Sequence, residues 1–163
     1  MVHDLTMERQ VQLLATALRD RGWRMAAAES CTGGQIAAAC TDLAGSSDWF
    51  DRGFVTYSNA AKADMLGVDT TLIDDHGAVS EPVALAMLQG ALQRAPVQVA
   101  VAVTGIAGPG GAVPGKPVGT VWLAWGTADA AHAERLQLPG DRAAVRSATV
   151  LAALSRLVEL AVP

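Results

Sequence analysis

Hydroxyl and thiol side chains stand in a row at Ser30, Cys31 and Thr32, within the stretch "ESCTGG". An apolar run precedes them and two glycines follow, which is typical of a junction between a strand and a helix. Such a junction can present a nucleophile and backbone N–H groups to one small pocket. It can equally be an ordinary helix cap. The residue types by themselves leave both interpretations open.

The choice of nucleophile depends on the available base. No G-x-S-x-G elbow surrounds Ser30, and the spacing of His3, His76 and His132 does not indicate a triad base. We interpret His76 as a turn residue and His132 as part of an edge strand. If Ser30 is the nucleophile, a lysine is therefore the expected base. Cys31 is the rival nucleophile, because a thiol at a helix N-terminus can have a lowered pKa.

The chain has two lysines, Lys62 and Lys116, and one tyrosine, Tyr57. Lys62 lies in the alanine-rich segment "NAAKADMLGV", which predicts a helix. A lysine there is either a solvated charge or a partly desolvated amine whose lowered pKa allows it to act as a base. Tyr57 could relay a proton or orient that amine.

The glycine-rich stretch "TGIAGPGGAVPGKP" (104–117) resembles part of a phosphate-binding P-loop at Gly110, Gly115 and Lys116. Position 117 is Pro, where a P-loop needs a hydroxyl for Mg²⁺, and a strand follows instead of a helix. We therefore reject a nucleotide triphosphatase. A long loop at the carboxyl end of a buried strand is where α/β sheets bind ligands, and a structural turn is the alternative.

Two arginines follow Asp141, the predicted N-cap of the last helix. Arg142 and Arg146 are four residues apart and share one face of that helix. Like charges at this spacing, near the positive end of a helix dipole, are locally unfavourable. An anion between them would compensate, since guanidinium groups bind phosphate bidentately. The alternative is that both are solvated near Asp141 or Glu134.

Apolar periodicity predicts helices at about 5–21, from the "ESCTGG" turn to 43, and at 59–68, 80–95 and 141–160. It predicts strands at about 24–28, 49–58, 97–105, 118–126 and 131–138. The third and fourth strands are apolar on both faces, which is typical of central strands covered by helices, and the fifth indicates an edge. We expect one domain over 1–163, a three-layer α/β/α fold with a mixed, mostly parallel sheet.

Composition excludes several classes of protein. With 163 residues, 51% of them hydrophobic, the chain is expected to be globular. A net charge of −4 with scattered Lys and Arg argues against nucleic acid as a partner. We expect no membrane span, no signal peptide and, from two cysteines without a disulfide pattern, a cytoplasmic protein. No residue cluster has metal-ligand spacing, so we expect neither a metal nor another cofactor.

Six segments occur along the chain in this order: "AESCTGG", "GFVTYSNAAKADMLGV", "GAVSEPVALAM", "AVTGIAGPGG", "KPVGTVWLAW" and "GDRAAVR". Together they closely resemble the CinA C-terminal-domain family, the nicotinamide mononucleotide amidohydrolases. The resemblance covers about residues 5–160. Some members carry an additional N-terminal domain that resembles molybdopterin-binding proteins, and this chain resembles the stand-alone form.

The resemblance implies hydrolysis of the carboxamide of nicotinamide mononucleotide to nicotinate mononucleotide and ammonia. It implies Ser30 as the nucleophile, with Tyr57 and Lys62 as proton-transfer partners. It assigns substrate binding to further positions: Glu29, Cys31, Thr32, Gly33, Gly34, Thr104, Gly105, Gly108, Arg142 and Arg146. The N–H groups of 32–34 would stabilise the oxyanion, the glycine-rich loop would line the ribose or ring, and the arginines would hold the 5′-phosphate.

We also expect a homo-oligomer that acts on a small molecule without a cofactor. The alternative function is a nucleotide-binding or regulatory module, associated with competence or DNA damage and without turnover. A pure binder has no need of Ser30, Tyr57 and Lys62 together, which favours the enzyme. Ammonia release from nicotinamide mononucleotide would distinguish the two.

Overall fold

A five-stranded sheet forms the middle layer of the computed structural model, which describes residues 2–163, with side chains from Thr6 onward. Its strands are β1 (Met25–Glu29), β2 (Phe50–Val55), β3 (Val99–Gly105), β4 (Thr120–Gly126) and β5 (Ala131–Gln137), in the spatial order β2-β1-β3-β4-β5. β1 pairs in parallel with β2 and β3, whereas β4 is antiparallel to both of its neighbours. Only β4 therefore runs against the others, and the predicted mixed, mostly parallel sheet is confirmed.

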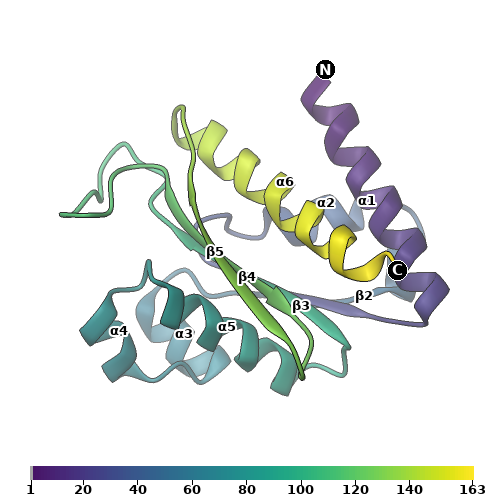
Figure 1. Ribbon diagram of the computed structural model, residues 1–163, viewed down its shortest axis with the longest axis horizontal. Helices are drawn as coiled ribbons and strands as arrows, with labels where there is room; N and C mark the ends of the chain where they lie inside the picture. The colour runs from purple at the N-terminus through teal and green to yellow at the C-terminus, as the bar shows by residue number, and fades with distance from the viewer. Residues whose placement is uncertain (1) are drawn as a thin grey trace.

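Helices cover both faces of the sheet (Figure 1). One face carries α1 (Val2–Arg21), α2 (Gln35–Thr41) and α6 (Arg142–Ala161). The other carries α3 (Asn59–Leu66), α4 (Thr70–His76) and α5 (Glu81–Arg94). A 3₁₀ turn, η1 (Ser46–Asp48), precedes β2. The predicted three-layer α/β/α architecture is confirmed.

The two faces of the sheet differ in side-chain size, because successive residues of a strand point to opposite sides. Toward α1 and α6 the strands present Met25, Val99, Val101, Val103 and Leu123, all buried. Toward α5 they present only alanines in the core: Ala26, Ala28, Ala100, Ala102 and Ala124. These alanines leave room for the larger buried side chains of α5. The central position of the fully buried β3 is as predicted.

The loops that carry the candidate site lie together at one end of the strands of the sheet. β1, β2 and β3 end there together because they are parallel, and Ser30 and Thr56 directly follow β1 and β2. The glycine-rich loop leaves the end of β3, and α6 begins at the same end after β5. Ligands of α/β sheets bind outside the carboxyl ends of parallel strands. The topology therefore brings all the predicted segments to one place.

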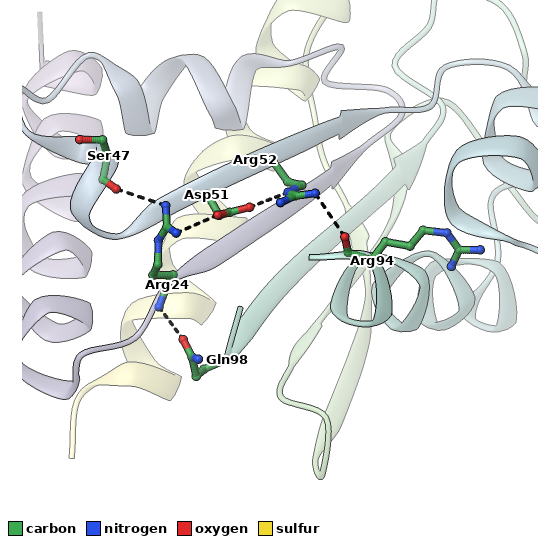
Figure 2. A network of polar contacts seen from close by, with 6 residues as sticks. All are labelled: Arg24, Ser47, Asp51, Arg52, Arg94 and Gln98. Carbon is green, nitrogen blue, oxygen red and sulfur yellow. Dashed lines mark hydrogen bonds and ion pairs between the residues drawn. The ribbon is translucent and has the colours of Figure 1, made fainter. Parts of the chain in front are cut away.

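A polar network joins the strand beginnings at the opposite end (Figure 2). Asp51, on β2, forms ion pairs with Arg24 at 2.9 Å and with Arg52 at 2.5 Å. The amide of Arg24 donates to the side chain of Gln98 at 2.8 Å, and Arg52 donates to the carbonyl of Arg94 at 3.3 Å. This network connects the starts of β1, β2 and β3 with the end of α5, so its role is structural.

One helix departs from the sequence prediction. His76 is the last residue of α4 and not a turn residue, so that interpretation was wrong. Asp69 begins α4 by accepting a hydrogen bond from the Thr71 amide at 2.9 Å, and Gly77 ends it. The helix has seven residues with few apolar side chains, which gives little periodicity to detect.

The residues that precede α5 and α6 behave differently. Asp141 caps α6 as predicted, accepting from the Ala144 amide at 2.9 Å. Ser80 also precedes its helix, α5, but its hydroxyl donates to the carbonyl of Gly77 at 2.8 Å and caps no amide. Over residues 2–163, no helix has both the length and the apolar character that a membrane crossing requires.

Candidate active site

Ser30 is held at the carboxyl end of β1 by backbone contacts. Its amide donates to the carbonyl of Val103 on β3, and its carbonyl accepts from the amide of Gly33, both at 3.0 Å. Gly33 and Gly34 have φ angles of 59° and 102°, a region that favours glycine. The two glycines thus allow the chain to turn sharply from Ser30 into α2.

Glu29 and Thr32 fix this turn from behind. The buried Glu29 carboxylate accepts hydrogen bonds from the Thr32 hydroxyl at 2.6 Å, the Ile36 amide at 2.8 Å and the Ala37 amide at 3.1 Å. These bonds satisfy amide groups of the first turn of α2 that have no partner within the helix. Glu29 therefore holds the turn, and its predicted contact with substrate stays a prediction.

Lys62 reaches Ser30 from α3, across the end of the sheet. Its Nζ lies 3.0 Å from Ser30 Oγ and donates to the carbonyl of Thr56, also at 3.0 Å. The side chain is 1% exposed. Ser58 caps α3, accepting from the Ala61 amide at 3.0 Å, and so fixes the first turn of the helix that carries Lys62. The predicted pair of a serine and a lysine is thus in direct contact.

Burial affects the amine and the neighbouring thiol in opposite ways. It lowers the pKa of Lys62, because desolvation penalises the ammonium form. It raises the pKa of Cys31 to about 12, because desolvation penalises the thiolate and the Glu29 carboxylate adds repulsion. A neutral amine beside Ser30 can act as a base, whereas a protonated thiol is a poor nucleophile. The electrostatics therefore favour Ser30 over Cys31.

A cavity of about 190 Å³, the catalytic cavity, opens at this pair. Its lining residues are Ser30, Cys31, Tyr57, Asn59, Lys62, Ala78, Val79, Gly105, Ala107 and Arg142. Gly105 has no room for a side chain, since a Cβ there would lie 3.2 Å from the Cys31 sulfur and 2.6 Å from Val121. This glycine keeps the wall of the cavity beside Cys31 flat.

Tyr57 is 60% exposed and bonds to Arg142, not to the serine or the lysine. Its hydroxyl accepts from Arg142 Nη2 at 2.8 Å, and Arg142 Nη1 donates to the carbonyl of Gly108 at 2.9 Å. Arg142 thus joins the β2–α3 loop to the glycine-rich loop across the mouth of the cavity. No relay through Tyr57 is needed, because Lys62 contacts Ser30 directly.

Arg146 holds the turn after the nucleophile. Its guanidinium donates to the carbonyls of Cys31 at 3.0 Å and Thr32 at 3.2 Å. In the described part of the chain, the amides of Thr32 and Gly34 have no hydrogen-bond acceptor. They are therefore the candidate donors to an oxyanion beside Ser30, whereas the Gly33 amide is already occupied.

A wider cavity of about 550 Å³, the arginine cavity, adjoins the catalytic cavity and shares Ala107 and Arg142 with it. Arg146 and the first residues of α6 also line it. Both guanidiniums face the site, as the shared helix face predicts, but neither is free. Glu134, the other partner considered from sequence, pairs with Arg156.

Comparison with known proteins decides the family. Residues 7–161 match the family model of the CinA C-terminal domain. The chain belongs to the CinA C-terminal domain family. It is 52% identical over 147 residues to the nicotinamide-nucleotide amidohydrolase PncC of Pseudomonas putida, covering 90% of this chain and 92% of that protein. The PncC of Escherichia coli (strain K12) is 53% identical over 142 residues, 86% of each chain.

Solved structures and longer relatives support the assignment of the chain to this family. The crystal structure of competence/damage inducible protein CihA from Agrobacterium tumefaciens superposes with a TM-score of 0.92 and 46% identity, over 94% of both chains. The chain spans only 34% of the CinA-like protein of Syntrophobacter fumaroxidans, with which it is 53% identical over 143 residues. The resemblance inferred from six sequence segments is confirmed.

The CinA domain brings six of the predicted site residues into the catalytic cavity: Ser30, Cys31, Tyr57, Lys62, Gly105 and Arg142. The remaining predicted residues lie outside its lining and support the walls. Thr104 is buried and donates to the carbonyl of Ala78 at 2.9 Å, and Gly108 accepts from Arg142. These two positions, like Glu29, position other groups and do not line the cavity.

The sequence interpretation missed four lining residues of the CinA domain: Asn59, Ala78, Val79 and Ala107. Asn59 precedes Lys62 by three residues, which puts both on one face of a helix, so its position could have been inferred. The other three are apolar and carry no chemical signal. None of the described histidine side chains lines the cavity, and His3 lies outside the described side chains.

Over the described residues, no group of three or more His, Cys, Asp or Glu side chains could hold a metal ion. Cys31 and Cys40 are both buried free thiols.

Proposed function

We propose that this CinA domain hydrolyses the carboxamide of nicotinamide mononucleotide, giving nicotinate mononucleotide and ammonia. The observation that carries the proposal is the 3.0 Å contact between Lys62 Nζ and Ser30 Oγ. A serine hydroxyl in contact with a buried lysine whose pKa is lowered is an activated nucleophile. The names of the Pseudomonas putida and Escherichia coli relatives support the choice of substrate.

The first half-reaction forms an acyl-enzyme. One N–H of neutral Lys62 donates to the Thr56 carbonyl, which directs the lone pair toward the Ser30 hydroxyl. Ser30 Oγ attacks the amide carbon while its proton passes to Lys62. The amides of Thr32 and Gly34 donate to the oxyanion, and one such donor is worth about 3–4 kcal/mol. Protonated Lys62 then gives its proton to the departing nitrogen, which leaves as ammonia.

The second half-reaction reverses these roles. Neutral Lys62 takes a proton from a water molecule as the water oxygen attacks the ester carbon. Collapse of the second tetrahedral intermediate breaks the bond to Ser30 Oγ, which recovers its proton from Lys62. Nicotinate mononucleotide is released, and no metal or cofactor takes part in any step.

The substrate is larger than the catalytic cavity alone would enclose, since ligand sites are usually at least about 300 Å³. We propose that the pyridine carboxamide occupies the catalytic cavity and the 5′-phosphate extends into the arginine cavity. Arg142 and Arg146 each use two N–H groups on the protein and retain others for a phosphate. Asn59, at the rim, is available to bind the carboxamide or ribose.

We further propose a role in the salvage of pyridine nucleotides, in the cytoplasm, by a homo-oligomer of this single domain. The alternative of a regulatory module without turnover gains no support from the site, because a binder does not need a serine activated by a buried lysine.

Ammonia release by the purified protein tests the proposal. Nicotinamide mononucleotide should give stoichiometric ammonia and nicotinate mononucleotide, with and without a chelator, and Ser30→Ala protein should give neither. Ammonia release that is lost on chelation and restored by a divalent ion would contradict this mechanism. An absence of turnover with nicotinamide mononucleotide, its riboside and the dinucleotide would favour the regulatory module.

A further inference from the structure

A second cavity of about 290 Å³, the cationic cavity, lies next to the catalytic cavity, and Val79 lines both. His76, Lys116 and Arg135 reach it from α4, the glycine-rich loop and β5, with Trp122 and the first residues of α5 completing the wall. Three elements distant in sequence thus direct nitrogen-bearing side chains to the cationic cavity.

The segment between the two cavities, residues 76–79, is fixed at three successive carbonyls. Lys116 Nζ donates to the carbonyl of His76 at 2.7 Å, and the Ser80 hydroxyl donates to that of Gly77 at 2.8 Å. Thr104 donates to the carbonyl of Ala78 at 2.9 Å. Whatever contacts Lys116 in the cationic cavity therefore acts on the segment that also forms a wall of the catalytic cavity.

Lys116 and Arg135 retain most of their hydrogen-bonding capacity. Each makes one hydrogen bond, Lys116 to His76 and Arg135 to the carbonyl of Gly115 at 2.8 Å. An ammonium has three N–H donors and a guanidinium has five. Within residues 6–163, neither forms an ion pair with a carboxylate, although Arg24, Arg52 and Arg156 each do.

The remaining groups of the cavity do not neutralise this charge. Glu81 is the single carboxylate of the lining and is exposed, and it forms no ion pair with either cation. The positive end of the α5 dipole, at the same residues, adds to the positive potential. Trp122, Pro82 and Pro114 add apolar surface beside the cationic donors.

We propose that the cationic cavity binds a phosphoryl group through Lys116 and Arg135. Ammonium and guanidinium donors converging from two sides suit the several acceptor oxygens of a phosphate. The proposed substrate has a single phosphate, which is assigned to the arginine cavity. The phosphoryl group bound here therefore belongs to a separate phosphorylated molecule beside the catalytic cavity.

Direct titration with inorganic pyrophosphate tests the site without any need for turnover. Wild-type protein should bind pyrophosphate calorimetrically, more weakly as salt is added. Lys116→Gln and Arg135→Gln should each raise Kd about tenfold or more, since a hydrogen bond to a charged group is lost. The side chain introduced by Lys116→Gln keeps an N–H donor but is one bond shorter, so unchanged riboside hydrolysis by this variant is the check that the wall is preserved.

Two control variants separate this site from general charge and from the arginine cavity. Arg9→Gln removes an exposed positive charge on α1 and should leave Kd within about twofold. Arg142→Gln should weaken only a pyrophosphate site in the arginine cavity, while the site that depends on Lys116 and Arg135 remains. No pyrophosphate binding by wild type, or a Kd unchanged in both cationic-cavity variants, would overturn the proposal.

Kinetics then distinguish the source. A rise in KM in Lys116→Gln for nicotinamide mononucleotide but not for its riboside would move the substrate's 5′-phosphate to the cationic cavity and contradict its assignment to the arginine cavity. An effect of pyrophosphate on riboside hydrolysis in wild type but not in Lys116→Gln would identify a separate molecule. Binding of pyrophosphate without a change in KM or in riboside hydrolysis would also identify a separate molecule. An inactive protein that still binds pyrophosphate through Lys116 would refute the amidase and leave the anion site standing.

Discussion

Lys62 Nζ and Ser30 Oγ lie 3.0 Å apart, although 32 residues separate them in the chain. The contact exists because β1 and β2 are parallel and end together, so the turn after β1 meets the helix after β2. The amine is 1% exposed and its other hydrogen bond goes to a backbone carbonyl, so no carboxylate stabilises its charged form. The fold thus holds a buried amine, whose pKa desolvation lowers, beside a serine.

Ser30→Ala should abolish amide hydrolysis, by about 10⁴-fold or more in kcat, because Lys62 Nζ bonds to no other hydroxyl among the described side chains. Cys31→Ala should cost less than about tenfold, because burial keeps that thiol protonated by raising its pKa to about 12. Steady-state ammonia release measures both. Activity that survives in the serine variant and disappears in the cysteine variant would reverse the assignment.

The two arginines of α6 should differ in which kinetic constant they affect. Arg142→Gln should raise KM for nicotinamide mononucleotide about tenfold, with little effect on the riboside, because the loss concerns the phosphate. Arg146→Gln should in addition lower kcat for both substrates by about 10²-fold, because the Cys31 and Thr32 carbonyls lose their donor and the turn shifts. Equal effects of both variants on both substrates would make the arginines structural only.

The sequence predicted the architecture well because the strands carry a strong pattern. β3 is apolar on both faces and is the central strand, whereas the alternating β5 is at the edge. α4 was missed because its seven residues have little apolar periodicity, although Asp69 and Gly77 are recognisable cap residues.

The roles of the site residues were harder to predict, because they depend on partners distant in sequence. The acceptors of Arg146 are carbonyls 115 and 114 residues away, and a backbone carbonyl carries no signature in the sequence. The positive charges of Arg142 and Arg146 led us to expect a bound anion between them. In the structure their hydrogen-bond acceptors are one hydroxyl and three backbone carbonyls. Ser30 and Lys62 were predictable because the segments that carry them resemble those of the CinA C-terminal-domain family, whereas their residue types alone left other interpretations open.

Replacing Lys62 by methionine should reveal the cost of burying the amine. Below the lowered pKa of the folded state, Lys62 is protonated in both states and wild type bears the full penalty of a buried charge. Between that pKa and about 10.4, the unfolded chain binds more protons than the folded one, so wild-type stability rises with pH.

The free energy of unfolding of wild type minus that of Lys62→Met should therefore increase with pH through this window. Each difference of one pKa unit is worth about 1.4 kcal/mol. The titration of Cys40 cancels because it is present in both proteins, whereas Cys31 interacts electrostatically with Lys62, so Cys31→Ala is introduced into both. Denaturant unfolding at several pH values measures the difference, and a pH-independent value would mean that folding leaves the pKa of Lys62 unchanged.

Lys62→Arg separates a base from a positive charge. A guanidinium stays protonated throughout the accessible pH range, so it can supply charge but cannot accept the proton of Ser30. The variant should lose at least about 10³-fold in kcat, in keeping with the loss of a general base. Near-normal rates in ammonia release would show that Lys62 acts only through its charge.

Titration of the two lysines by NMR measures directly whether the pKa of Lys62 is low enough for its amine to act as the base for Ser30. The chain contains only Lys62 and Lys116, so protein labelled with ¹³C at lysine Cε should give two resonances, assigned with Lys116→Gln. We expect the Lys62 resonance to titrate clearly below about 10.4, the pKa of a solvated lysine, and the acidic limb of kcat/KM to follow the Lys62 midpoint. A Lys62 midpoint at or above about 10.4 would mean that the amine is charged at neutral pH and cannot activate Ser30.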